Sequence, residues 1–464
     1  MSCIIFILTS TSGEILDYFK NKKDEIAKFL SELIRVDTSN PPGNELEAAK
    51  LIGEKLAEYG LKYEIIISEK KRANIITSVK GEEEGPRFLL LSHLDVVPAK
   101  PDGWKYHPFS GLIKDGYVWG RGAIDDKGHV VVELFTLLAL IENRVKFRGE
   151  VIFAATADEE KGGKLGAGWL VENYPDKVRA DYVINEGGGL GIKIGDKTVF
   201  IVQTAEKGVY WFRLKVKGKP GHASIPASGE NAIITMSKII QRTEKNKPSI
   251  KVVKPVRAMI ETLAKAYGRP LLSKLLLNRL TSELALKIIA RKDLSLAALI
   301  DAMLRNTITP TILTSGYKEN IIPDEASCIF DCRLLPGYDE KFVKEYINAV
   351  MEGLDYDLEF IHREPASTSK IGRLYHIIEK VIAREVPNSI VTPYMSTGGT
   401  DSRFFRWRFN SVAYGFQPIL ADMPLSEFLK MIHGVNERIS IKNLVFGAKV
   451  TYEIIRELMV SSGG

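Results

Sequence analysis

Cysteine is scarce in this sequence. Of its three cysteines, Cys3, Cys328 and Cys332, the last two lie in a strand-like run without a second pair to complete a thiolate zinc site. Three cysteines also give no even framework of disulfides. We therefore interpret them as free thiols and expect a reducing, cytoplasmic location.

Long apolar runs and blocks of like charge are also missing. The opening run, residues 3–8, is far shorter than the roughly 20 apolar residues that span a bilayer, and no later run reaches that length. The formal net charge of +6 is mild for 464 residues, and no block of five like charges forms a basic arm. We therefore expect neither a membrane nor a nucleic acid as a partner, and we interpret the opening run as a dispensable tail.

Two common catalytic signatures are absent as well. The sequence has no G-x-S-x-G motif, which argues against a serine nucleophile on a strand-to-helix turn. It also has no G-x-x-x-x-G-K-[ST] loop, which argues against binding of nucleotide phosphates. The chemistry must therefore be sought in other residues.

Strands and helices alternate in the first 207 residues. Apolar residues recur at helical spacing in residues 14–36, residues 126–143 form a largely apolar segment typical of a buried helix, and short apolar runs bounded by turn residues indicate strands. This alternation favours an α/β fold with a mostly parallel sheet flanked by helices. The predicted strands are residues 63–67, 73–79, 88–91, 151–156, 182–185 and 199–204.

The pattern changes after Gly208. An alternating run at residues 210–216 and later strands at 311–313 and 328–333 indicate an antiparallel sheet. A chain of this length exceeds what one hydrophobic core usually organises. We predict a larger domain in two parts, residues 1–207 and 358–464, with an inserted α+β domain at 208–357 that carries a helical elaboration at 256–305.

Side chains able to bind a metal occur in four segments, of which three follow a predicted strand and the second, GRGAIDDKG, precedes a predicted helix. The carboxyl ends of parallel strands meet at one edge of a sheet, and carboxylates gathered there repel one another unless a cation compensates. Imidazole with carboxylates and no thiolate suits zinc, cobalt or manganese, and a bridging carboxylate could hold two ions. The residues are His93 and Asp95 in SHLD, Asp125 in GRGAIDDKG, Glu159 and Glu160 in ADEEKGG, and Glu186 in INEGGG.

In this order, SHLDVVP, GRGAIDDKG and DEEKGG resemble the zinc-dependent amidohydrolase and peptidase family that includes aminoacylase, carboxypeptidase G, carboxypeptidase S and succinyl-diaminopimelate desuccinylase. The later segments GKPGHAS, ENIIPDEASCIFDCRLLPG, GGTDSR and MIHG agree with it. The resemblance runs from about Pro41 to the last predicted helix. It implies a di-zinc catalytic domain with an inserted lid or dimerisation domain.

The resemblance also implies a set of metal ligands. One divalent ion would be bound by His93, Asp125 and Glu186. Zinc is the preferred ion, and cobalt and manganese are the alternatives. A second would be bound by Asp125, Glu160 and His433, so that Asp125 bridges the pair. Position 186 is Glu where many relatives carry Asp, which leaves the subfamily open.

Three further residues receive catalytic roles from the resemblance. Glu159 would be the general base that takes a proton from the attacking water. Asp95 would hold the ring of His93 in its metal-binding tautomer. His222 would stabilise the oxyanion, in this family often from the partner subunit of a dimer.

Substrate-binding residues follow in the same way. Asn320 and Arg333 resemble the residues that bind the free carboxylate of the substrate, a task that suits a guanidinium. Gly398, Gly399 and Thr400 resemble the glycine loop that borders the substrate pocket.

We therefore expect a metal-dependent hydrolase that cleaves an amide or peptide bond in a small molecule or short peptide with a free carboxylate. It would be an N-acyl amino acid deacylase or a carboxypeptidase or dipeptidase, and a homodimer through the inserted domain. Succinyl-diaminopimelate desuccinylase and acetylornithine deacetylase would use the same residues, and a non-catalytic binding protein on this fold is a further alternative. The 256–305 elaboration has no counterpart that the resemblance explains.

Overall fold

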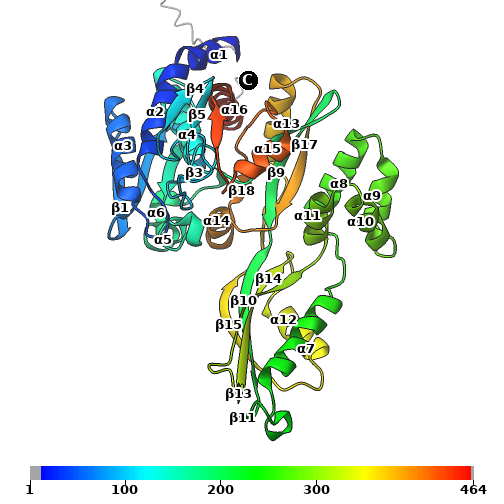
Figure 1. The fold of residues 1–464 in the computed structure, drawn as a ribbon. Coiled ribbons are helices and arrows are strands. Elements are labelled where there is room, and N and C mark those ends of the chain that lie inside the picture. Colours follow the sequence, from blue (N-terminus) through cyan, green and yellow to red (C-terminus); the bar gives the residue numbers. More distant parts are fainter. Residues whose placement is uncertain (1–11, 461–464) are drawn as a thin grey trace, which may run out of the picture. The chain divides into compact units, whose positions relative to one another are not determined.

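The computed structural model describes residues 12–460, so Cys3 and the predicted N-terminal tail lie outside the described residues. The chain divides into two compact units (Figure 1). The larger unit comprises Met1–Thr204, Ser369–Pro393 and Thr400–Gly464, and the smaller unit comprises Ala205–Thr368 and Tyr394–Gly399.

A ten-stranded mixed sheet organises the larger unit. Its four central strands, in the order β6-β3-β7-β18, pair in parallel, whereas the strands at both margins pair antiparallel. The predicted α/β class is confirmed, with parallel pairing in the middle of the sheet. The strands are β1 (Tyr63–Glu69), β2 (Arg72–Lys80), β3 (Glu83–His93), β6 (Arg148–Thr156), β7 (Tyr182–Asn185), β8 (Gly191–Ile194), β9 (Lys197–Glu206), β16 (Ser367–Thr368), β17 (Ser389–Ser396) and β18 (Val412–Gly415).

Helices cover both faces of this sheet, because β3 is apolar on both sides. Phe88 and Leu90 belong to one buried cluster, and Leu89 and Leu91 belong to another. Most of the helices pack into the first cluster, and α5, α6 and α14 pack into the second. The helices are α1 (Ser12–Asn21), α2 (Lys23–Arg35), α3 (Glu45–Glu58), α4 (Lys127–Glu142), α5 (Ala167–Asn173), α6 (Pro175–Val178), α13 (Arg373–Glu385), α14 (Ser402–Phe409), α15 (Leu425–Met431) and α16 (Ile441–Met459).

Several elements of the larger unit were not predicted, among them a small sheet and the helix α15. The three-stranded sheet β19-β5-β4 joins Arg438–Ser440 to Tyr117–Trp119 and Leu112–Lys114. The same region of the chain contains α15, after which His433 follows. Strands of three residues carry too little periodicity to be recognised from sequence.

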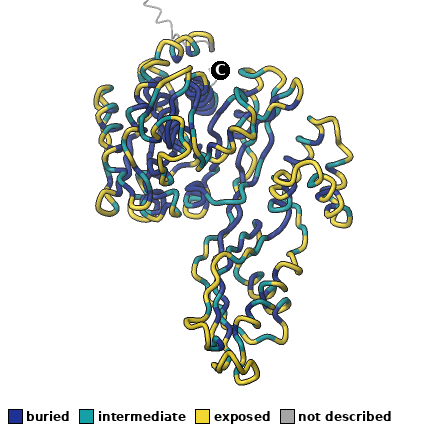
Figure 2. The backbone as a smooth tube through the Cα atoms, in the orientation of Figure 1, coloured by how far each residue is buried: buried dark blue, intermediate teal, exposed yellow. Residues whose placement is uncertain are grey.

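The smaller unit is built on an antiparallel sheet of the order β12-β14-β10-β15. One cluster of buried apolar residues joins this sheet to α7 and α12, and a second joins α8 to α11 to Ala205, Leu335 and Met395. Figure 2 marks the buried and exposed positions along the backbone. The predicted start of the last part at residue 358 falls inside β15, which pairs with β10 in the smaller unit. The elements are β10 (Gly208–Lys217), β11 (Gly221–His222), β12 (Thr307–Ser315), β13 (Ile321–Ile322), β14 (Glu325–Leu334), β15 (Asp357–Glu364), α7 (Ala232–Lys245), α8 (Lys254–Ala266), α9 (Pro270–Leu277), α10 (Ser282–Ala290), α11 (Leu294–Leu304) and α12 (Glu340–Val350).

Among residues 12–460, no helix combines the length and the apolar character that crossing a membrane requires.

Candidate metal centre

Five of the predicted ligands lie together in the larger unit. His93 is the last residue of β3, and Glu160 and Glu186 follow the neighbouring strands β6 and β7. Asp125 lies in the loop before α4, and His433 follows α15. The carboxyl ends of three adjacent parallel strands thus supply three of the five side chains, as expected for this class of sheet.

The five side chains form two groups that share Asp125. Nε2 of His93 lies 3.1 Å from Oδ1 of Asp125 and 3.9 Å from Oε1 of Glu186. Nε2 of His433 lies 3.1 Å from Oδ2 of Asp125 and 3.4 Å from Oε2 of Glu160. Within each group the donor atoms lie within 4.8 Å of one another, and the two oxygens of Asp125 face different groups.

The electrostatics of the cluster favour positive charge. The carboxylates of Asp125 and Glu160 raise the pKa of His433 to about 10. Burial opposes protonation of His93, yet hydrogen bonds to Asp125 and Asp95 hold its pKa well above the usual value. Burial raises the pKa of Glu186 well above that of an ordinary glutamate, and the neighbouring carboxylates add to this effect. Without a metal, protonation of these side chains is therefore favoured. A bound cation would supply the same positive charge.

The donor set fits divalent metal ions. Imidazole nitrogens and carboxylate oxygens without thiolates suit zinc, cobalt and manganese. Within the described part of the chain, Oε1 of Glu160 is buried and accepts no hydrogen bond from protein. This oxygen is therefore available to bind a metal ion. Each group offers three protein donors, which is the number that catalytic zinc sites commonly use.

Asp95 connects the end of β3 with the turn after β6. Nδ1 of His93 lies 2.9 Å from the backbone oxygen of Asp95 and 3.4 Å from its Oδ1. The Asp95 carboxylate accepts the backbone N–H groups of Glu159 at 3.1 Å and Glu160 at 3.2 Å, and the side-chain amide of Asn40 at 2.8 Å. Asp95 thus orients the His93 ring mainly through its backbone, while its carboxylate holds the turn.

Glu159 stands beside the two groups and belongs to neither. It begins the 3₁₀ turn Glu159–Lys161, directly after Asp158, whose left-handed backbone (φ 71°) redirects the chain. Burial raises the pKa of Glu159 well above the usual range, with help from Asp401 and against the effect of His93. A carboxyl group with a raised pKa, adjacent to a metal ligand, has the properties of a general base.

Glu437 is a functional residue that sequence reasoning missed. Its buried carboxylate accepts the backbone N–H groups of Ile124 at 2.7 Å and of Asp125 and Gly122 at 3.1 Å, and the Arg121 guanidinium at 2.7 Å. Glu437 lies four residues after His433, so it ties the segments of two ligands together. The only sequence feature that could have indicated Glu437 is its position shortly after the MIHG motif. A charged residue near a motif is too common to identify a site residue.

A second buried polar group lies on α4 behind the ligands. Oδ2 of Asp126 accepts the backbone N–H of His93 at 3.1 Å. Nδ1 of His129 lies 3.6 Å from Oδ1 of Asp126, and its Nε2 lies 3.5 Å from Oε1 of Glu133. The helical spacing aligns these three residues on one face of α4, an arrangement that no sequence motif announced.

The smaller unit carries five of the predicted site residues, of which His222, Asn320 and Arg333 lie in its first segment. His222 is exposed in β11, and its Nδ1 lies 2.7 Å from Oγ of Ser224. The backbone oxygen of Asn320 accepts the N–H of Ala223, which brings Asn320 next to the His222 segment. Arg333 in β14 forms a two-pronged ion pair with Asp331, with N–O distances of 2.6 Å and 2.9 Å.

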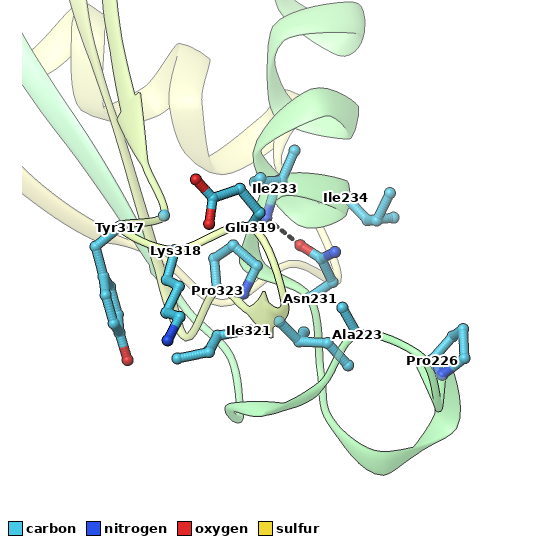
Figure 3. A pocket seen from close by; sticks show the side chains of 12 residues that line it. Ala223, Pro226, Asn231, Ile233, Ile234, Tyr317, Lys318, Glu319, Ile321 and Pro323 are labelled. Atoms are coloured by element: carbon cyan, nitrogen blue, oxygen red, sulfur yellow. Dashed lines mark hydrogen bonds between the residues drawn. The ribbon is translucent and has the colours of Figure 1, made fainter.

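A surface pocket of about 780 Å³ adjoins the His222 segment (Figure 3). Ala223 and Ile321, the neighbours of His222 and Asn320, line it together with Asn231, Ile233 and Pro323. The lining is mainly apolar, with the Asn231 side chain engaged in accepting the N–H of Ile233.

The predicted glycine loop follows β17. The N–H of Gly398 donates to Oγ of Ser396 at 3.1 Å, and a Cβ placed on Gly398 would meet only this oxygen, at 3.9 Å. Packing within the chain therefore does not require glycine at 398. Gly399 ends this segment of the smaller unit, and the buried Thr400 begins the next segment of the larger unit.

Comparison with known proteins gives a consistent result. The profile of Peptidase family M20/M25/M40 matches residues 89–457. The N-fatty-acyl-amino acid synthase/hydrolase PM20D1 of Xenopus tropicalis is 33% identical over 362 residues, which cover 76% of this chain and 69% of that protein. The probable carboxypeptidase S-like 2 of Dictyostelium discoideum is 30% identical over 425 residues, which cover 88% and 78%. The M20 family metallo-carboxypeptidase Sso-CP2 from Sulfolobus solfataricus matches with a TM-score of 0.69 and 20% identity, over 93% of this chain and 98% of that one.

Proposed function

Because this chain belongs to Peptidase family M20/M25/M40, it is a metal-dependent hydrolase of amide or peptide bonds, and we propose that its substrates are N-acyl amino acids. The observation that carries this proposal is the pair of donor groups that share Asp125, with Glu159 beside them. A relative that is 33% identical is named for N-fatty-acyl-amino acids, which favours a long apolar acyl group. Carboxypeptidase activity is the second candidate, favoured by the carboxypeptidase S-like relative.

The residues of the larger unit divide the work of hydrolysis. The two donor groups would hold two divalent cations, with zinc preferred over cobalt or manganese. These cations would polarise the scissile carbonyl and lower the pKa of bound water. Glu159 takes a proton from the attacking water and delivers it to the leaving amine. Asp95 keeps Glu159 and Glu160 in place through their backbone N–H groups, and Glu437 does the same for Asp125.

We assign substrate binding to the smaller unit. Asp331 occupies the Nε and Nη2 side of the Arg333 guanidinium, so Nη1 is left to bind the substrate carboxylate together with Asn320. His222 donates a hydrogen bond to the developing oxyanion from its exposed turn. Gly398, Gly399 and Thr400 border the pocket for the substrate.

We further propose a homodimer through the smaller unit. Strand β12 lies at the edge of its sheet, and its residues Ile312 and Leu313 are exposed. An exposed apolar edge strand is a template for pairing with a second copy. A cytoplasmic location fits the buried free thiols of Cys328 and Cys332.

A substrate panel tests the proposed function. The zinc- or cobalt-loaded protein is assayed against N-acetyl, N-oleoyl and N-succinyl amino acids, acetylornithine and dipeptides, with release of free amine as the readout. We expect kcat/KM for the long-chain N-acyl amino acids to exceed that for dipeptides at least tenfold. A preference for dipeptides would support the carboxypeptidase alternative, and turnover of the succinyl or acetylornithine substrates alone would support the biosynthetic alternatives. No turnover in the metal-loaded protein would favour a binding protein.

A further inference from the structure

The helical elaboration exposes an unusual number of apolar side chains. Nine of the 24 large hydrophobic side chains exposed among the described residues lie between Tyr267 and Leu299, in 33 of the 464 residues of the chain. We call five of them the leucine cluster, and Leu280, in the turn between α9 and α10, is 91% exposed. The leucine cluster consists of Leu271, Leu275, Leu280, Leu284 and Ile288.

The exposure has a structural cause. Helices α8 to α11 turn a separate set of side chains inward, among them Ile260, Leu276 and Leu286, and these form a buried cluster that also includes Leu335 and Met395. The leucine cluster is therefore additional to the core of these helices. On α9, Leu271 and Leu275 are four residues apart, as are Leu284 and Ile288 on α10, so each pair forms one stripe.

Cations are interleaved with these leucines. Residues 254–305 carry ten Lys or Arg and four Asp or Glu, a surplus of six positive charges that equals the net charge of the whole chain. Within the described residues, no ion pair engages the six cations between 267 and 292, whereas Glu283 is paired with Arg305. These six cations, here the cationic rim, are Arg269, Lys274, Arg279, Lys287, Arg291 and Lys292.

From the leucine cluster and its cationic rim we infer that this elaboration docks on the surface of a phospholipid bilayer with anionic headgroups. Apolar side chains at helical spacing enter the boundary of the acyl region, while unpaired Lys and Arg side chains stay among the phosphates. Such docking needs no spanning segment. The sequence predicts no membrane partner because no apolar run is long enough to span a bilayer. Docking on the surface would limit that expectation to spanning segments.

A second copy of the chain is a poorer occupant. A two-fold interface brings the same patch of both copies together, so the cationic rim of one copy would face the cationic rim of the other. Because α9 and α10 each carry one of these cations and the other four flank the two helices in the sequence, burying the leucines in this way would bring like charges close together. An anionic surface removes this conflict.

Flotation of the full-length protein with vesicles tests the inference, and catalytic turnover is not needed for it. Binding is measured on phosphatidylcholine vesicles with and without 30% phosphatidylglycerol, at low and high salt. We expect binding to the anionic vesicles and at least tenfold weaker binding to neutral ones. Leu280→Ser/Leu284→Ser should weaken binding at least tenfold, and Lys287→Ala/Arg291→Ala about 30-fold at low salt.

The control variant is Ile67→Ser/Ile371→Ser, which removes two exposed side chains of similar size from the larger unit. It should bind like the wild type. Equal binding of all four proteins, or no binding of the wild type to anionic vesicles, would overturn the inference. Conversion of a dimer to a monomer by the leucine variant in light scattering would assign the cluster to a second copy, and a large drop in its Tm would assign it to the interior of the fold. Either result would also overturn it.

Discussion

Two adjacent glutamates of the turn after β6 have different surroundings. Glu160 belongs to a donor group with Asp125 and His433, whereas Glu159 belongs to none and has a raised pKa. Glu159→Gln should therefore lower kcat by about 10²–10⁴-fold without changing the metal content. Activity assays with metal analysis of the same samples check this, with Glu160→Gln as the matched variant that should lose metal as well. Substantial activity in Glu159→Gln would show that another group takes the proton.

The carboxylate of Glu437 supports the loop that carries Asp125. Glu437→Gln removes its charge and leaves the Arg121 guanidinium buried without a counter-charge. We expect a loss of about 3–5 kcal/mol in the free energy of unfolding and a roughly 10–100-fold weaker metal affinity. Urea unfolding and metal titration measure the two effects. Unchanged metal affinity in a folded variant would mean that the loop does not depend on this residue.

At the scale of elements, the carboxyl end of α11 is contacted by the buried side chain of Lys207. Nζ of Lys207 donates to the backbone oxygens of Ala302 at 3.0 Å and Arg305 at 2.9 Å, at the end of the helix where a cation is favoured. Burial nevertheless lowers the pKa of Lys207 to about 8, below the value of about 10.4 for an unfolded chain. The cost of burying this charge is thus fully present below pH 8 and fades as the pH rises toward 10.

This pKa shift predicts a pH dependence with a defined sign. Between pH 8 and 10 the unfolded chain binds more protons at Lys207 than the folded chain, so the wild type should gain stability relative to Lys207→Met. The gain should be at most about 1.4 kcal/mol per pH unit. Urea unfolding of both proteins at pH 7.5 and 9.5 gives the difference. A constant or falling difference would contradict the shift.

Elements with a strong local signal could be predicted from the sequence. The apolar run at residues 88–91 indicated strand β3, the largely apolar segment 126–143 indicated helix α4, and a last helix was predicted where α16 lies. Strand β15 was missed because its place is decided by pairing with β10, about 150 residues away in sequence. Pairing of that kind leaves no local pattern.

The same contrast holds for the candidate site. The residues of the two donor groups could be predicted because they sit in compact motifs that resemble those of a known family, three of them at strand ends. Glu437 and the polar group of Asp126, His129 and Glu133 could not, since their importance arises from hydrogen bonds between segments far apart in sequence. The Asp331 partner of Arg333 was equally unforeseen, although it lies only two residues away.

For the whole molecule, the proposed dimer gives a test of His222. If His222 acts in the site of the partner subunit, a mixture of Glu159→Gln and His222→Ala proteins forms mixed dimers with one complete site. After random subunit exchange the mixture should recover about a quarter of wild-type activity. The control is each variant alone, incubated in the same way. Activity no greater than the sum of the two variants would place His222 in its own site or outside catalysis.

The central claim concerns two divalent ions that share Asp125. Calorimetric titration of the metal-free protein with zinc tests it most directly, since it counts the ions per chain. The account predicts two for the wild type, one each for His93→Ala and His433→Ala, and none held tightly by Asp125→Ala. A single ion in the wild type, or two retained by Asp125→Ala, would contradict it.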